Sequence, residues 1–130
     1  MDAYSQQILA SLEWVERSLT SARDFRGCAF LNALAELGTE DSEARELAVA
    51  YKESRRLWYR DLLSQLDVDD PDTLATQLSL LVDGAYGAVL IHRDPAMMRP
   101  AIAAARTLLK AAGVAISTGE AKSVAIGQVP

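Results

Sequence analysis

Apolar residues recur every three or four positions through the first twenty residues of the chain, the spacing of one face of an α-helix. This stripe consists of Tyr4, Ile8, Leu12, Val15 and Leu19. It predicts an amphipathic helix from Tyr4 to Ser21. The pattern breaks around Asp24 to Gly27, and a second apolar group predicts a short helix that ends at Gly38. That group consists of Phe30, Leu31, Leu34 and Leu37.

A longer amphipathic pattern runs from Ser42 to Leu66 and predicts a third helix. Its apolar stripe consists of Leu47, Tyr51, Trp58, Leu62 and Leu66. At about 1.5 Å per residue this helix would extend across the whole domain. An acidic turn from Asp67 to Asp70 ends it. Asp70 is suited to cap the next helix, and Pro71 to take its first position, where a missing N–H costs nothing.

The fourth predicted helix, from Pro71 to His92, is apolar on more than one side. One stripe consists of Leu74, Leu78, Leu81, Ala85, Val89 and His92, and a second set of Leu80, Val82, Tyr86, Leu90 and Ile91. Gly84 and Gly87 lower the helix propensity but allow another helix to approach closely. One chain of this size can hardly cover all these faces, so the pattern favours a second copy of the chain as a partner.

An Asp94-Pro95 turn opens the fifth predicted helix. Pro100 predicts a kinked or separate first turn, with the helix itself starting near Arg99. Ile102, Ala105, Leu109 and Ala112 form its apolar face, and Gly113 ends it. The weak Val, Ala and Ile alternation among Gly and Ser in residues 114–130 predicts a mobile tail. The expected organisation is therefore one all-α domain over residues 1–113, followed by this tail.

Composition narrows the possible functions. The chain has 130 residues, half of them hydrophobic but 6% aromatic, which suits a single helical core. Its net charge of −5 opposes independent binding to the phosphate backbone of DNA. The single cysteine and the absence of a signal-peptide pattern make the cytoplasm the expected compartment. No run reaches about 18 consecutive apolar residues, so no membrane contact is expected.

Taken in order, these segments resemble the C-terminal ligand-binding and dimerisation domain of TetR-family transcriptional regulators. The resemblance covers Ser5 to Gly113 and includes the entry segment Arg26-Gly27-Cys28-Ala29-Phe30-Leu31-Asn32-Ala33. It implies a five-helix domain whose last two helices form a four-helix bundle with those of a second copy. It also implies a basic helix-turn-helix DNA reader before this domain, for which the chain leaves no room ahead of the first helix.

The same resemblance implies an apolar cavity for a small molecule among the first four helices. The candidate ligand-binding residues are Trp14, Phe30, Leu34, Tyr51, Trp58, Leu62, Leu81, Asp83 and Tyr86. Taken singly, the apolar members are better explained as core packing, and the resemblance is what favours a cavity for the set as a whole. Asp83 and Asn32 stand within apolar runs, where a buried polar group needs a partner. Each has a structural explanation: Asp83 could bond to the backbone of a neighbouring helix, and Asn32 could fix the junction of the first two helices.

The dimer interface is expected on the fourth and fifth helices. Its candidate residues are Val82, Val89, Leu90, Ile91, Ile102, Ala105 and Leu109.

No catalytic residues, metal ligands or cofactor sites are expected, and the chain is not predicted to be an enzyme. His92 has no second histidine at helical spacing, and its place at a helix C-terminus is explained by the helix dipole. Cys28 is expected to be a buried small hydrophobe, with a redox role as the alternative. The basic stripe of the third helix is expected to be solvated. It consists of Lys52, Arg55, Arg56 and Arg60.

The predicted function is an effector-sensing and dimerisation domain that binds a small apolar or amphipathic molecule. DNA would be contacted through a helix-turn-helix domain missing from this chain. The alternative is a structural helical dimer without a ligand, with pairing to intact regulators as one form of it.

Overall fold

The computed structural model describes residues 2–21 and 42–116, and all regular structure in these ranges is helical. The elements are α1 (Ala3–Ser21), α3 (Ser42–Leu63), α4 (Pro71–His92), the 3₁₀ turn η1 (Pro95–Met97) and α5 (Met98–Ala111). The described part contains no strand, which confirms the all-α prediction. The short helix expected at Phe30 to Leu37 lies outside the described residues, as do Cys28 and Asn32.

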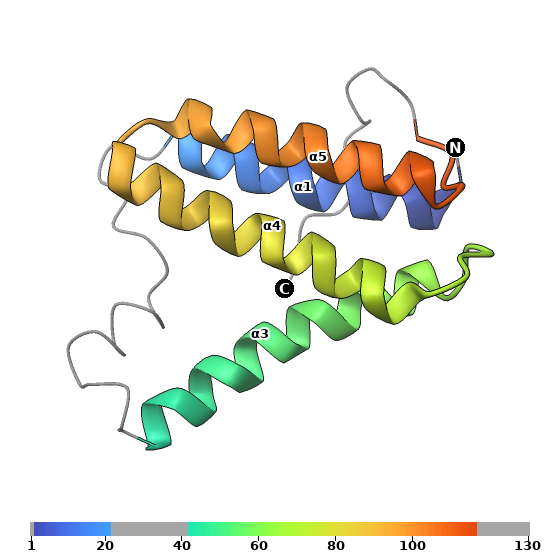
Figure 1. Cartoon of the computed structure of the whole chain (residues 1–130), viewed down its shortest axis with the longest axis horizontal. Helices are drawn as coiled ribbons and strands as arrows, with labels where there is room; N and C mark the ends of the chain where they lie inside the picture. Colours follow the sequence, from blue (N-terminus) through green and yellow to red (C-terminus); the bar gives the residue numbers. More distant parts are fainter. Residues whose placement is uncertain (1, 22–41, 117–130) are drawn as a thin grey trace.

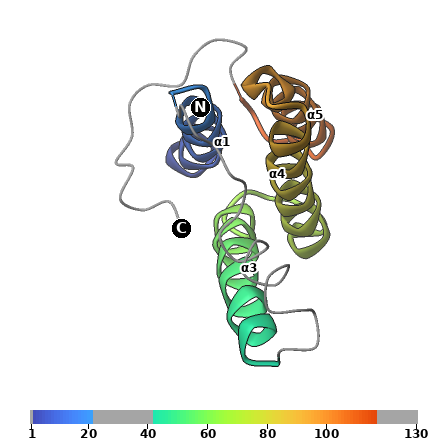
Figure 2. The same cartoon turned by 90° about the vertical axis from the view of Figure 1, so that its left-hand side faces the viewer.

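The helices are arranged around α4, which packs against both α3 and α5 (Figure 1). α1 lies along α5 and also contacts α3. From the turn that joins them, α3 and α4 diverge, so the N-terminal half of α3 extends away from the other helices (Figures 1 and 2). The space between α3 and α4 therefore widens away from their connecting turn.

Side-chain caps fix where α4 and η1 begin. The carboxylate of Asp70 accepts hydrogen bonds from the Thr73 backbone N–H (3.1 Å) and hydroxyl (2.7 Å), with Pro71 at the start of α4. Asp94 accepts one from the Ala96 N–H at 3.0 Å, ahead of η1. Both caps confirm the predicted starts. A third cap, the Ser5 N–H to Asp2 bond of 2.8 Å at α1, had not been predicted.

The C-terminal helix behaves as its sequence predicts at both ends. Pro100 is the third residue of α5 and follows the separate turn η1, so its missing N–H removes no bond from the helix interior. After α5, Gly113 takes a φ of 87°, in the region that favours glycine. Val114, placed in the expected tail, is 5% exposed and belongs to the core. The ordered body therefore extends beyond Gly113, and residues 117–130 lie outside the described ranges.

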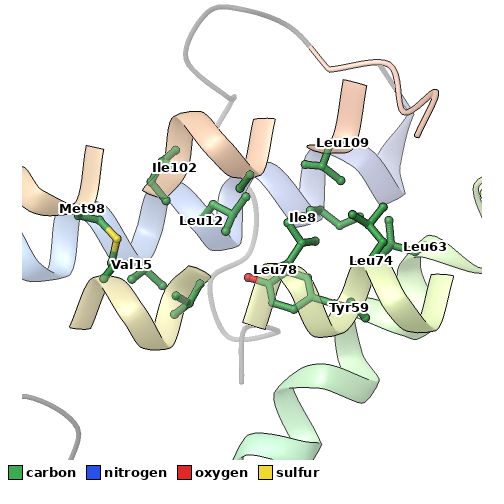
Figure 3. Close-up of a cluster of buried hydrophobic side chains, with 14 of the residues drawn as sticks. Ile8, Leu12, Val15, Tyr59, Leu63, Leu74, Leu78, Met98, Ile102 and Leu109 are labelled. Atoms are coloured by element: carbon green, nitrogen blue, oxygen red, sulfur yellow. The ribbon is translucent and has the colours of Figure 1, made fainter. Parts of the chain in front are cut away.

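The core is largely aliphatic and is drawn from all four α-helices (Figure 3). α1 supplies Ile8, Leu12 and Val15, and α5 supplies Ile102 and Leu109. From α4 and α3 come Leu74, Leu78, Tyr59 and Leu63. Most of these side chains are almost completely buried, so this cluster supplies the main hydrophobic stabilisation of the fold.

By length and hydropathy, α4 is the one described helix that could cross a membrane. A central helix of a helical bundle meets the same criteria. One side of α4 carries core residues, and Asp72 and Asp83 on it are ion-paired with α3. These contacts fit the central-helix explanation, and the absence of membrane contact stays a prediction.

Candidate functional site

An open groove of about 310 Å³ lies between the diverging helices α3 and α4. Ala48, Val49 and Leu80 give it apolar surface, and charged side chains flank it on both helices. The complete lining is Arg45, Ala48, Val49, Lys52, Glu53, Arg56, Thr76, Ser79, Leu80 and Asp83. Apolar surface combined with a few polar groups is the usual composition of a small-molecule site.

Two ion pairs that share Asp83 join the two helices beside the groove. Asp83 on α4 accepts hydrogen bonds at the same carboxylate oxygen from Lys52 (2.7 Å) and Arg55 (2.5 Å) on α3. The side chain of Asp83 is 30% exposed and that of Arg55 is 9% exposed. Asp83 thus bonds to a neighbouring helix, as one interpretation had it, but to side chains instead of backbone. The prediction of a solvated basic stripe is wrong for Arg55, because its side chain is buried. The ion pair with Asp83 compensates the buried charge.

A second ion-pair group lies nearer the turn between α3 and α4. Arg56 donates to Glu53 on its own helix and, at 2.6 Å, to Asp72 on α4. The hydrogen bonds with Glu53 and Asp72 raise the pKa of Arg56 above its already high value, and the one with Arg56 lowers the pKa of Glu53. Glu53 and Arg56 therefore remain charged near neutral pH. Ion pairs thus join α3 to α4 at two places, Asp83 and Asp72.

Two buried polar atoms in the described part have no hydrogen-bond partner, namely Arg55 Nε and Ser79 Oγ. Ser79 lines the groove and is 9% exposed. A buried donor or acceptor without a partner carries a desolvation cost. The contact between α3 and α4 therefore leaves hydrogen-bonding capacity unused at these two atoms.

The predicted ligand-binding residues are mostly placed elsewhere. Among the described members, Asp83 lines the groove. Five are partly buried and pack against the core, namely Trp14, Trp58, Leu62, Leu81 and Tyr86. Tyr51 is 40% exposed, and Phe30 and Leu34 lie outside the described residues.

Next to these aromatics, Tyr59 joins α3 to α1. Its hydroxyl forms a 2.8 Å hydrogen bond with that of Ser11, and its ring meets Trp58 edge to face at 5.3 Å. Burial raises the pKa of Tyr59, although the Ser11 hydrogen bond acts in the opposite direction.

The predicted dimer residues divide into two groups. Five belong to the core of the chain itself, with exposures of 4% or less: Val82, Val89, Ile102, Ala105 and Leu109. The apolar stripe they form faces other helices of the same chain. Leu90 and Ile91 are exposed, at 39% and 79%.

The outer surface of α4 carries a different stripe, formed by Leu80, Gly84, Gly87 and Ile91. Their spacing of four, three and four residues places them along one helix face. Leu80 is 64% exposed and Ile91 79%. A Cβ added at Gly84 or Gly87 would meet no atom within 4 Å, so packing within the described chain does not require either glycine. We call these four residues the α4 outer stripe.

Sequence reasoning missed the Lys52–Asp83–Arg55 bridge and the groove beside it. A signal was present, since Asp83 interrupts an apolar run and two cations stand three residues apart on the preceding helix. Pairing them required the relative register of α3 and α4, which periodicity within each helix cannot supply.

No protein-family model matches the chain, and no solved structure does. The chain is 27% identical over 105 residues to the HTH-type transcriptional regulator YjdC of Escherichia coli K12, and equally to that of Shigella flexneri. The chain is similar to transcriptional regulators. This similarity covers 81% of the chain and supports a regulatory role over an enzymatic one. The chain spans about half the length of these curated relatives, 54%.

Proposed function

We propose that the chain is an effector-sensing and dimerisation domain of a TetR-like transcriptional regulator. The observation that carries the proposal is the similarity to HTH-type regulators along most of an all-helical chain. With a net charge of −5, the chain is poorly suited to hold DNA itself. DNA contact belongs, in this proposal, to a helix-turn-helix segment outside the chain, and the protein acts in the cytoplasm.

In the proposed dimer, two copies meet along the α4 outer stripe, with Leu90 at its edge. Exposed Leu80 and Ile91 provide apolar surface, and Gly84 and Gly87 allow the two backbones to approach. This placement keeps the dimer on α4 as predicted but leaves the core residues of α4 and α5 inside each protomer. The α5 helix contributes its exposed side to the bundle.

The proposed regulation couples a small ligand to the geometry of this dimer. α3 and α4 touch through ion pairs beside an open groove, so a molecule bound to one arrangement of the two helices favours that arrangement. Because α4 also carries the dimer stripe, a shift of α4 changes the spacing of attached DNA readers.

The dimer is tested by light scattering coupled to size-exclusion chromatography. We expect the wild type to elute as a dimer at micromolar concentration and Ile91→Glu as a monomer, because two carboxylates would meet across the symmetry axis. Leu47→Glu is a matched control, since Leu47 is 59% exposed on α3. A monomeric wild type would contradict the proposal.

The glycines allow a sharper version of this test. Gly84→Ala should stabilise the isolated helix by up to about 1 kcal/mol, because alanine has the higher helix propensity. It should also weaken dimerisation, because the added methyl group occupies the space of the partner. A variant that gains thermal stability and dimerises normally would remove Gly84 from the interface.

The alternative function is a structural helical dimer without a ligand, either with a second copy or with an intact regulator. It is favoured by the packing of the predicted aromatic pocket residues against the core. Thermal shift distinguishes the two, because a ligand at one hundred times its Kd stabilises the native state by about 2.7 kcal/mol.

A further inference from the structure

We propose that the α3–α4 groove binds a small organic anion, a carboxylate on an apolar body of roughly eight carbons. This proposal deepens the regulatory function above, on which it rests for its biological consequence, by placing the effector site and naming its chemical class. The site is distinct from the predicted aromatic pocket, with which its lining shares Asp83.

The size and surface of the groove set the body of the ligand. A volume of about 310 Å³ accepts a short alkyl chain or a single aromatic ring, but not a large polycyclic molecule. Val49 and Leu80, which are 61% and 64% exposed, face it from opposite helices. An apolar body inserted between them would remove both side chains from water, which is the main favourable contribution to binding.

The charges around the groove set the headgroup. Its lining holds three cations and two carboxylates, within a chain whose net charge is −5. Both carboxylates are already compensated, Asp83 by Lys52 and Arg55, and Glu53 by Arg56. No hydrogen bond or ion pair joins the Arg45 guanidinium to another described residue. Among the described residues, Arg45 is thus the lining charge without an ionic partner, and a planar guanidinium pairs well with a carboxylate.

A second observation points to a polar ligand atom. Ser79 is nine-tenths buried, lines the groove and has no partner for its hydroxyl. A serine hydroxyl can donate and accept, and rotation about its side-chain bond redirects it. A ligand oxygen seated in the groove would satisfy it, which an alkane could not do.

The position of the groove gives ligand binding a route to the dimer. Leu80 belongs both to the groove lining and to the α4 outer stripe. A ligand that packs against Leu80 from the α3 side therefore changes the surface presented to the second copy. The binding site and the dimer contact are adjacent parts of one helix.

Isothermal titration calorimetry with three eight-carbon probes tests the site. Octanoate, octanol and octylammonium share an apolar body and differ in the charge of the headgroup; the two ions are used below their micellar concentrations and octanol below its solubility limit. We expect octanoate to bind the full chain roughly tenfold more tightly than octylammonium, with octanol between them. Equal affinities for the two ions, or tighter binding of octylammonium, would overturn the anion assignment.

Variants locate the binding. Val49→Trp fills the groove from an exposed position and should weaken octanoate binding at least tenfold. Arg45→Gln should weaken it about threefold, as expected for an ion pair at a solvated rim, and should leave octanol unchanged. Lys110→Gln is the matched control, because it removes one exposed cation on α5, and should have no effect. Circular dichroism melting verifies that each variant is folded.

The outcomes separate the site from the regulatory function. Octanoate binding that survives Val49→Trp in a folded protein overturns the groove, even where light scattering shows the expected dimer. Binding with the predicted headgroup order and variant pattern supports the groove, even where the chain is monomeric and the proposed dimer fails.

Discussion

α4 meets its two main neighbours in different ways. Towards α5 it presents aliphatic side chains that join one continuous buried cluster, including Leu78 and Val82. Towards α3 it also shares this cluster with Tyr59 and Leu63, but outside the cluster it presents Asp72 and Asp83, which form ion pairs with α3. One side of the helix is buried and closely packed, whereas the ion-paired side is partly exposed to solvent and borders an open groove.

This difference indicates how stability and adjustability are divided in the molecule. Burial of aliphatic surface depends on close packing, so a small shift of α4 against α5 would open voids. Long charged side chains can follow a small displacement while retaining their ion pairs, and water can replace lost contacts. Movement linked to a ligand is therefore expected between α3 and α4, while α1, α4 and α5 form the stable frame.

The largest expected effect is a cavity in this frame. Leu78 is fully buried, and Leu78→Ala should lower the free energy of unfolding by about 3 kcal/mol. Leu80→Ala on the same helix is the matched control, because Leu80 is 64% exposed. It should change the stability of the monomer by less than about 0.5 kcal/mol. Urea unfolding followed by circular dichroism gives both values when it is carried out in the monomeric Ile91→Glu background, and similar losses would remove the distinction between the two sides of α4.

The next effect concerns the ion-paired side. Asp83→Asn preserves the shape of the side chain but leaves the guanidinium of Arg55, which is 9% exposed, without its counter-ion. We expect a loss of about 2 kcal/mol, less than for a fully buried pair because Asp83 is 30% exposed. Asp61→Asn, in a pair that is 71% exposed at the aspartate, should have almost no effect.

A double-mutant cycle sharpens this prediction. In an Arg55→Met background the buried cation is absent, so Asp83→Asn should then cost under about 1 kcal/mol. An equal cost in both backgrounds would mean that Asp83 stabilises the fold independently of Arg55, and that their ion pair contributes nothing to the free energy of unfolding.

Tyr59 joins the two sides, since it belongs to the core and bonds across to α1. Tyr59→Phe leaves the buried Ser11 hydroxyl without its partner and should cost about 1.5 kcal/mol at pH 7. Burial raises the pKa of Tyr59 above its ordinary value near 10. Folding therefore favours the protonated phenol, and its stabilisation is complete below pH 10 and is lost as the pH rises towards the folded-state pKa. The deficit of Tyr59→Phe should accordingly shrink above pH 10 in urea unfolding, and a deficit that is constant with pH would contradict this.

Much of the fold could be predicted because its signals are local. Helical periodicity gave the limits of α1 and α4, and Asp70-Pro71 and Asp94-Pro95 marked helix starts through caps that need no distant partner. The end of α3 was placed three residues late, at Leu66 instead of Leu63, because the apolar stripe continues into the following turn. The buried position of Val114 depends on tertiary packing, which a weak local pattern does not reveal.

The candidate site was less predictable because it depends on which faces meet. An apolar stripe predicts burial but does not identify the covering helix. Val82 and Val89 were therefore expected in a dimer contact and lie in the core of one chain. The groove depends on the angle between α3 and α4, and its ion pairs join residues about thirty positions apart. The glycines of the α4 outer stripe were visible in the sequence, but only the structure shows that no other described part of the chain covers them.

The smallest expected effect concerns the turn between α3 and α4, where α4 starts. Asp70 starts α4 just after α3, and its hydrogen bonds from the Thr73 hydroxyl and N–H lower its pKa below the ordinary 3.8. Its stabilisation is thus present above the unfolded-state pKa and is lost as the pH falls through the folded-state value. Asp70→Ala should lower the melting temperature slightly at pH 7 and hardly at all near pH 2, whereas Asp70→Asn should keep most of the cap at both. Because the turn also sets where α3 and α4 diverge, octanoate binding should weaken slightly in Asp70→Ala and remain normal in Asp70→Asn.

The pH dependence decides whether the carboxylate is the capping group. A melting difference between wild type and Asp70→Ala that persists at pH 2 would mean that it is not.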